Sequence, residues 1–158
     1  MKRGPLLSWD IYSVHVFNFL KSLKKKKDIE RLVEFQNKFK WDFQIEETLF
    51  NTEYKAIIIT DDNQKIIWVN DGFKDMTGYS LAFLKDKSPR ILQGEKTSRV
   101  ALDQIRAQLA TDSFCQTSMV NYRKDGSEYM CEIKIYPVHN SNHKVKHYIA
   151  LENEALLN

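Results

Sequence analysis

The sequence predicts an α+β fold in which a five-stranded antiparallel sheet has helices on one face and follows an N-terminal helical extension. Three observations lead to this prediction. Apolar side chains recur at helical spacing from residue 8 to about residue 40. Residues 55–70 read as strand, turn and strand, and residues 112–140 read as a long hairpin. The helical segments between the two pairs of strands must then cover one face of the sheet.

The N-terminal extension contains two helical runs. Ser8 can cap the first run, and Asp10 lies in its first turn. Asp28 can cap the second run. The apolar spacing of the first run comes from Trp9, Tyr12, Val16, Phe19, Leu20 and Leu23, and that of the second from Ile29, Leu32, Val33, Gln36 and Phe39. No Gly or Pro lies between Pro5 and Gly72, so the lysine run between them can either join or separate the two helices.

The remaining elements follow in order along the chain. The segment KAIIITDDNQKIIWVN gives two strands with an Asp-Asp-Asn turn. Short helices separated by Gly78, Pro89 and Gly94 come next, and residues 96–110 form an amphipathic helix. Asp-Gly is a strong hairpin signal, so the hairpin is expected to turn at Lys124-Asp125-Gly126. The segment KVKHYIALENE is expected to form the last strand. We therefore divide the chain into an extension, residues 1–46, and a sensory-type domain, residues 47–158.

Composition excludes several classes of protein. The 158 residues suit one modest domain with an appendage, and 42% hydrophobic with 28% charged residues is a globular balance. No apolar run is long enough for a membrane span, and no cleavage site follows the N-terminus, so neither a membrane partner nor a signal peptide is expected. Cys115 and Cys131 are too few to staple a fold, and the expected location is the reducing cytoplasm.

The net charge of +3 lies within residues 1–50, mainly in the run KSLKKKK at residues 21–27. Nucleic-acid binding would need this run to join a wider basic face or stacking aromatic residues. Here it is a single patch between helical segments. It is therefore interpreted as a solvated helix face or linker, and no nucleic-acid partner is expected.

A shell of one sheet and one helical layer encloses a space in which small ligands commonly bind. Two segments indicate which family the shell resembles. IIWVNDGFKDMTGYSLAFL resembles the opening of a PAS domain, in which a strand ends on Asn and leads into short helices with Thr-Gly-Tyr. VNYRKDGSEYMCEIKIYPV resembles its central hairpin. The resemblance covers about residues 48–154 and implies the PAS fold.

Within that family the chain is most similar to the flavin-binding, light-sensing LOV branch. The LOV signature reads Asn-Cys-Arg-Phe-Leu-Gln-Gly, and residues 88–94 read Ser-Pro-Arg-Ile-Leu-Gln-Gly. The LOV cysteine forms a covalent adduct with the flavin after light absorption. Pro89 stands at that position and has no nucleophile, so the resemblance implies a site without adduct photochemistry.

The resemblance also implies a set of flavin contacts. Arg90 and Arg106 match two arginines that hold the flavin phosphate, a task that suits the planar guanidinium group. Gln93 matches the signature glutamine. Asn121 matches an asparagine of the first hairpin strand that hydrogen-bonds the pyrimidine edge of the ring.

Three positions depart from the LOV pattern. Ser88 replaces the signature asparagine, and Cys131 replaces a second hairpin asparagine but is a poor hydrogen-bond partner. Glu152 replaces the last-strand glutamine that senses the N5 and O4 edge. A carboxylate there would repel an anionic flavin, whereas a protonated Glu152 could donate a hydrogen bond, and burial would favour that state.

Simpler interpretations of these residues stay open. Arg90 and Arg106 can form surface ion pairs, and Glu152 can lie exposed at a strand end. Asn121 can satisfy backbone groups near the hairpin turn, Gln93 can cap a short helix, and Cys131 can be a small buried apolar residue.

The resemblance implies a sensory domain that binds FMN or FAD. We expect it to be non-enzymatic, because no catalytic constellation stands out. Haem is disfavoured because residues 70–135 contain no His, and a metal site at His139, His143 and His147 is not expected in a loop and strand region. A small metabolite is a further possible ligand. The alternative is a ligand-free interaction module. The expected partner is a second copy, paired through the N-terminal helices and the sheet face, or a signalling protein, because no output module follows the last strand within this sequence.

Overall fold

The computed structural model describes residues 8–156, with side chains from residue 10 onward. The sheet contains the five predicted strands, β2 (Ala56–Asp61), β3 (Ile66–Val69), β4 (Cys115–Tyr122), β5 (Glu128–Asn140) and β6 (Val145–Ala155), and all pairings are antiparallel. A further two-residue strand, β1 (Trp41–Asp42), pairs with the end of β5. The strand order is β1-β5-β6-β2-β3, with β4 on the other part of β5. The predicted α+β PAS fold is confirmed.

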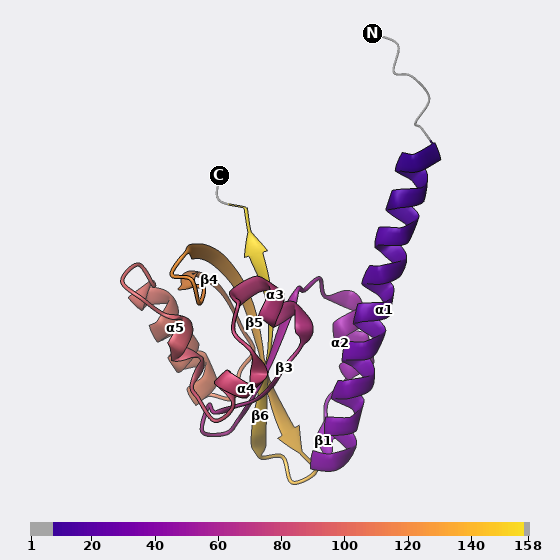
Figure 1. The fold of residues 1–158 in the computed structure, drawn as a ribbon. Coiled ribbons are helices and arrows are strands. Elements are labelled where there is room, and N and C mark those ends of the chain that lie inside the picture. Colours follow the sequence, from indigo (N-terminus) through magenta and orange to yellow (C-terminus); the bar gives the residue numbers. More distant parts are fainter. Residues whose placement is uncertain (1–7, 157–158) are drawn as a thin grey trace.

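The predicted short helices cover one face of the sheet (Figure 1). They are α3 (Asp71–Thr77), α4 (Leu81–Leu84), the 3₁₀ turn η1 (Pro89–Leu92) and α5 (Arg99–Ala110). Gly78 ends α3 in the left-handed conformation with φ 79°, which glycine adopts without a steric penalty. Gly126, with φ 85°, forms the predicted hairpin turn in the same way. These turns hold the helical layer over the inner face, where one apolar cluster forms around Phe73, Met76 and Leu84.

The lysine run joins the two predicted N-terminal helices into one. Helix α1 runs continuously from Ser8 to Phe39. Asp28 is therefore not the cap of a second helix, as expected, but a buried residue inside α1 that accepts hydrogen bonds from Asn70 and Tyr54. Asp10 lies in the first turn of α1 as predicted, whereas the proposed cap by Ser8 falls outside the described side chains.

The second half of α1 covers part of the outer face of the sheet together with α2 (Ile45–Asn51). Leu32 and Leu49 are fully buried there against Ile57 and Leu151. At the far end, Trp41 Nε1 donates a hydrogen bond of 2.9 Å to His147 Nδ1, and Phe39 packs on the same imidazole ring. This contact attaches β1 to the sheet. The division into residues 1–46 and 47–158 stays a prediction.

Asn70 ties three parts of the fold together. Its Oδ1 accepts hydrogen bonds from the backbone N–H of Ile57 in β2 and of Phe73 in the first turn of α3. Its Nδ2 donates to Asp28 in α1 at 3.0 Å. Because the side chain is buried, each group that loses its partner would remain unsatisfied.

We therefore expect Asn70→Ala to lower the free energy of unfolding by about 2–4 kcal/mol, since it removes a helix cap and two further buried hydrogen bonds. Urea unfolding followed by circular dichroism measures the change. Asn63→Ala, at an exposed turn position, is the matched control and should change stability little. Equal effects of the two substitutions would show that Asn70 is not the link that the contacts indicate.

Candidate functional site

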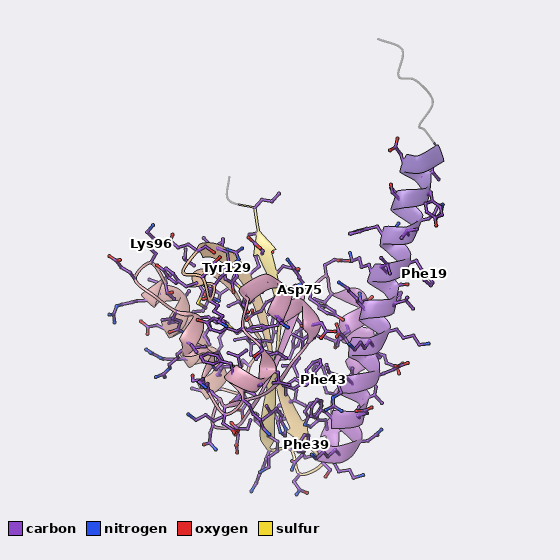
Figure 2. All side chains as sticks on the ribbon, viewed as in Figure 1. Phe19, Phe39, Phe43, Asp75, Lys96 and Tyr129 are labelled. Carbon is purple, nitrogen blue, oxygen red and sulfur yellow. The ribbon has the colours of Figure 1, made fainter. Side chains whose placement is uncertain are left out.

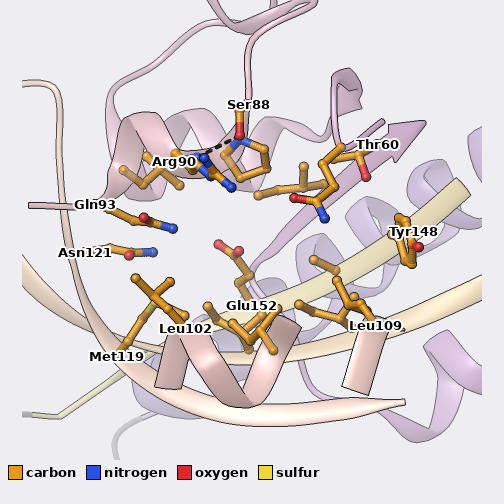
Figure 3. A pocket seen from close by; sticks show the side chains of 18 of the residues that line it. Thr60, Ser88, Arg90, Gln93, Leu102, Leu109, Met119, Asn121, Tyr148 and Glu152 are labelled. Carbon is orange, nitrogen blue, oxygen red and sulfur yellow. Dashed lines mark hydrogen bonds between the residues drawn. The ribbon is translucent and has the colours of Figure 1, made fainter. Parts of the chain in front are cut away.

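A cavity of about 270 Å³ lies between the inner face of the sheet and the layer formed by η1 and α5 (Figure 3). An engineered cavity of about 150 Å³ admits benzene, so this space can take a larger ring system. Most of the wall is apolar, and the polar side chains are few. The lining residues come from β2, η1 and the residues that flank it, α5, β4, β5 and β6. Besides the polar residues described below, they include Ile58, Thr60, Leu102, Ile105, Leu109, Met119, Ile133, Ile135, Tyr148 and Ala150.

Two arginines border the cavity at its exposed side. Arg90 comes from η1 and Arg106 from α5, and both line the cavity while their side chains reach solvent. Arg106 also forms the surface ion pair that was considered as an alternative, at 3.0 Å from Asp103. An exposed pair three residues apart on a helix contributes only a few tenths of a kcal/mol, so Arg106 can exchange it for a ligand anion.

The turn η1 positions the signature residues. Ser88 is its N-cap and accepts a hydrogen bond from the Arg90 backbone N–H, and Pro89 occupies the first position, where its missing N–H costs nothing. Gln93 ends the turn, as the capping alternative predicted, and its backbone N–H donates to the Arg90 carbonyl at 3.0 Å. Its side chain nevertheless lines the cavity. Ser88, Pro89, Arg90 and Gln93 thus all face one space.

Gly94 fixes where this turn meets strand β4. A Cβ atom there would lie 2.4 Å from the ring of Tyr122, so only glycine allows this approach. The Tyr122 hydroxyl accepts a hydrogen bond from the Lys96 backbone N–H at 3.0 Å. The loop is therefore held against β4, beside Asn121 (Figure 3).

Two polar side chains at the inner part of the cavity have atoms without hydrogen-bond partners in the described part of the chain. Asn121 and Glu152 are each 3% exposed, and Asn121 Oδ1 and Glu152 Oε2 are buried and unpaired. Neither the backbone role considered for Asn121 nor the exposed position considered for Glu152 is observed for these atoms. Unpaired buried polar atoms are rare in folded proteins, and each costs about 1–3 kcal/mol. The Tyr129 hydroxyl, on the residue opposite Asn121 in the β4–β5 pair, is also buried and unpaired, but it does not line the cavity. Asn121 and Glu152 do line it, so their unpaired atoms are available to a ligand there.

Glu152 is the titratable group inside the cavity. Its strand β6 pairs it with Ala56 of β2 and Ile133 of β5, so both flanking neighbours are apolar. Burial raises the pKa of the Glu152 carboxyl to about 7, although the neighbouring Cys131 thiol acts to lower it. Near neutral pH the side chain can thus either donate or accept a hydrogen bond.

Cys131 is the predicted site residue that the structure does not bring into the cavity. It is fully buried in the apolar cluster of the inner face, as the alternative interpretation expected, and it is absent from the cavity lining. Burial raises the pKa of the Cys131 thiol, and so does the nearby Glu152 carboxylate. Cys131 is therefore an unreactive neighbour of Glu152 that lies outside the cavity lining.

Several lining residues were not predicted, although the sequence carried a signal for them. Tyr148 and Ala150 share the cavity face with Glu152 because alternate residues of a strand point to the same side. The same alternation places Ile58 and Thr60 of β2 on this face. Extending the two-residue period from Glu152 would have identified Tyr148 and Ala150, whereas no matched residue lies in β2 to indicate which of its faces lines the cavity.

The three histidines near the last turn do not form a metal site. Among residues 8–156, no group of three or more His, Cys, Asp or Glu side chains is arranged to hold a metal ion. His147 instead accepts the Trp41 hydrogen bond on the outer face of the sheet.

Within residues 8–156, no helix is long and apolar enough to cross a membrane.

Comparison with known proteins agrees with this geometry. The family model described as PAS domain matches residues 55–154. A nitrogen fixation regulatory protein of Klebsiella oxytoca is 34% identical over 99 residues, which are 63% of this chain and 20% of the relative. A blue-light photoreceptor of Listeria monocytogenes is 32% identical over 107 residues, 66% of this chain and 42% of the relative. The chain thus spans less than half the length of these curated relatives.

Solved structures show the same likeness. The light-state structure of the blue-light photoreceptor Aureochrome1 LOV is 25% identical, with a TM-score of 0.63 over 65% of this chain and 83% of that one. An RNA-binding Light-Oxygen-Voltage receptor is 29% identical, with a TM-score of 0.59 over 63% of this chain and 29% of that one. Structural neighbours therefore include LOV domains.

The raised pKa of Glu152 leads to a prediction about how the free energy of unfolding of the ligand-free protein depends on pH. Its pKa of about 7 in the folded protein lies above the ordinary value of 4.5, so the folded protein binds more protons between these pH values. The favourable contribution of the protonated side chain is complete below pH 4.5 and is lost as pH rises through 7. Relative to Glu152→Gln, the native protein should lose about 3 kcal/mol of unfolding free energy over this window.

Urea unfolding of both proteins at a series of pH values measures this difference. Burial lowers the pKa of His147, so its contribution is lost as pH falls, but it is present in both proteins and cancels. The exposed Glu95→Gln is the matched control and should keep the native pH profile. Parallel profiles for the native protein and Glu152→Gln would contradict the assignment.

Proposed function

The chain belongs to the PAS domain family, and we propose that it is a sensory domain that binds a flavin nucleotide, FMN or FAD, in the cavity between η1, α5 and the sheet. One observation carries the proposal. The cavity combines exposed guanidinium groups at one side, apolar walls, and unpaired buried polar atoms at the inner part. A ligand that fits must have an anionic tail, a flat apolar body and a hydrogen-bonding edge, and a flavin nucleotide has all three.

The described residues provide a partner for each part of this ligand. Arg90 and Arg106 would hold the phosphate, and Gln93 and Asn121 would hydrogen-bond the polar ring edge. Leu102, Ile105 and Ile133 would cover the ring faces. A bound flavin would supply blue-light absorption and electron exchange, which no side chain can provide.

Glu152 would set the protonation requirement of the site. A protonated carboxyl donates a hydrogen bond to an acceptor atom of the ring, while a carboxylate accepts one from a donor and repels an anionic ring. Because the pKa of Glu152 is about 7, both forms are accessible near neutral pH. A change in the charge of the ring would therefore change the proton position and the hydrogen bonds of strand β6.

The second part of the proposal concerns how this domain would pass a signal to another protein. We propose no catalytic turnover for this domain, since the sequence contains no recognisable catalytic constellation. Signalling would instead pass through association, with a second copy paired through the N-terminal helices as the partner. A large part of the outer sheet face over β2 and β6 is already covered by α1 and α2. The first half of α1, where every described side chain from residue 10 to residue 24 is exposed and which projects beyond the sheet in Figure 1, is the available surface.

A ligand-free interaction module is the second candidate function. The observation that favours it is the apolar surface exposed on the first half of α1, which requires no ligand. The two candidates are compatible, and ligand binding separates them.

Binding of FMN and riboflavin tests the flavin proposal. The native protein should bind FMN more tightly than riboflavin, which lacks the phosphate. Arg90→Ala and Arg106→Ala should each weaken FMN binding about tenfold while leaving riboflavin binding nearly unchanged. Flavin fluorescence quenching, together with an absorption spectrum of the purified protein, measures both affinities.

Arg99→Ala is the matched control, because Arg99 is an exposed arginine of α5 outside the cavity lining. It should leave both affinities unchanged. Failure to take up either flavin would overturn the flavin proposal. Equal loss of FMN and riboflavin binding in the cavity variants would overturn the assigned phosphate contacts.

Pro89 leads to a separate prediction about light. It lines the cavity but offers no nucleophile, so illumination of the flavin-loaded native protein should cause no bleaching through a protein thiol. Pro89→Cys supplies a thiol at the same wall and should make the visible flavin band bleach reversibly in blue light. Absorption spectra before and after illumination measure this difference, and Pro89→Ser serves as the control without a thiol.

A further inference from the structure

The end of α1 is held on the outer face of the sheet by aromatic rings packed around His147. Phe39, the last residue of α1, has its ring centroid 4.3 Å from that of the imidazole, and Trp41 of β1 has its centroid at 5.2 Å. Phe35 stacks on both Phe39 and Trp41. Figure 2 shows Phe39 where the end of α1 meets the sheet. The buried His147 is therefore a titratable group inside an aromatic contact.

One hydrogen bond in this contact exists only while His147 is neutral. Trp41 Nε1 donates to His147 Nδ1 at 2.9 Å. An indole nitrogen donates and does not accept, so Nδ1 must be without a proton and the neutral imidazole carries its proton on Nε2. Protonation would place an N–H group on Nδ1, and two donors would then face each other at hydrogen-bond distance. One of the two rings would have to turn away.

Strand β1 is a short attachment that depends on this hydrogen bond. It is two residues long and pairs with the end of β5, where Trp41 lies opposite Asn140 and Asp42 opposite His139. Lys40 forms the corner between α1 and β1, with a φ of 58° in the left-handed region. A residue with a Cβ atom is disfavoured there, so the surrounding contacts must hold the corner. Loss of the Trp41 hydrogen bond would remove one of these contacts.

The charged groups nearest His147 oppose one another. Burial has the largest effect and lowers the pKa of His147, and Lys146 of β6 also lowers it. Asp61, which lies opposite His147 on β2, and the following Asp62 raise this pKa. The net effect is a lowered pKa, so the imidazole of the folded protein is neutral above its ordinary value of 6.5.

The other elements packed at this end of the sheet contribute further charged groups. The ammonium group of Lys38, in the last turn of α1, lies 5.1 Å from the Phe39 ring centroid. β5 and β1 contribute His139 and Asp42, which are Cα partners in the short β1–β5 pairing. A titration in this region can thus come from His139 as well as from His147, and an experiment must separate the two.

We propose that the contact between Trp41 and His147 is a pH-sensitive switch, which holds β1 and the end of α1 on the sheet when His147 is neutral and releases them when it is protonated. The switch goes beyond the proposed function, because it needs no ligand in the cavity and lies on the opposite face of the sheet. His147 is nevertheless adjacent in β6 to Tyr148, which lines the cavity. Protons and a cavity ligand would thus act on the same helix through one strand.

The direction of the pH dependence follows from the lowered pKa of His147. The attachment is complete above pH 6.5 and is lost as the pH falls through the lower value of the folded protein. Glu152 titrates near pH 7, on the other face of the sheet and in the opposite direction. The two groups therefore give separate transitions.

A pH titration of the full chain, labelled with ¹⁵N and followed by NMR, tests the switch. The Trp41 indole N–H signal, identified by its absence in Trp41→Phe, should keep one position above pH 6.5. At lower pH it should shift with the same midpoint as the His147 ring. The backbone amide signals of residues 39–42 should change with that midpoint, whereas those of α3, beside the other attachment of α1, should not.

The variant His147→Asn separates the hydrogen bond from the charge. Asparagine offers an amide oxygen near the position of Nδ1 and does not titrate, so the Trp41 signal should stay at its bonded position at low pH. In Trp41→Phe the imidazole no longer has to keep Nδ1 bare, and its midpoint should rise toward 6.5. His139→Gln, and His143→Asn at the exposed turn between β5 and β6, are the matched controls and should keep the native transition.

Several outcomes would overturn the switch. A Trp41 signal that stays constant while the His147 ring titrates would show that protonation does not break the contact. A His147 ring that stays neutral until the protein unfolds would show that the switch is never operated. A transition that persists in His147→Asn, or that disappears in His139→Gln, would assign it to another group. A change at the Trp41 indole without a change at residues 39–42 would overturn the release of β1. The native titration decides even where a variant fails to fold, because both signals come from the native protein.

Discussion

Strand β6 lies inside the sheet between β5 and β2, and the two-residue alternation of its side chains connects the cavity to the surface under α1. Tyr148, Ala150 and Glu152 face the cavity. Ile149 and Leu151, between them, are buried on the opposite face in the cluster that includes Leu32 of α1. Both sets of side chains leave one backbone, so a displacement of the strand on the cavity side also moves the side chains packed under α1. A ligand that pairs with Glu152 would therefore also act on the apolar cluster between β6 and α1.

The cavity itself is kept at an energetic cost. The fold leaves an internal space and two buried oxygens without partners, at Asn121 and Glu152, where apolar side chains could have filled the volume. Each unpaired atom costs about 1–3 kcal/mol, and every 1.4 kcal/mol recovered on binding is a tenfold gain in affinity. A ligand that pairs with both atoms thus gains affinity from a deficit already present in the free protein. Filling the space with apolar side chains would remove the energetic cost of the unpaired atoms, and it would also remove the preference for a ligand that hydrogen-bonds to them.

Strand alternation and turn residues are local signals, and they allowed the strands and short helices to be predicted from the sequence. The resemblance to LOV domains supplied the seven proposed site residues, and six of them line one cavity. Cys131 is an example of a position that local signals cannot predict correctly. It lies on the same face as Ile133 and Ile135, which line the cavity, yet it is packed in the core beyond the cavity. Alternation gives the face of a strand but not how far along the strand the cavity extends. Strand β1 was missed for a related reason: its attachment depends on Trp41 and His147, which are 106 residues apart in the chain.

The continuity of α1 also depends on distant contacts, and it gives the helix its mechanical role. Lysines are good helix formers, but the run is additionally anchored where Lys25 donates to the Phe50 carbonyl and Lys27 pairs with Asp71. Asp28, bonded to Asn70, is the buried attachment nearest to the exposed first half of α1, and the exposed contact between Lys21 and Glu53 lies beyond it. From Asp28 to Tyr12 the helix extends about 24 Å, so a tilt of about 5° at the sheet moves Tyr12 by about 2 Å. A ligand that interacts differently with two positions of β6 can thereby shift the population of α1 orientations, by no more than its difference in affinity for them.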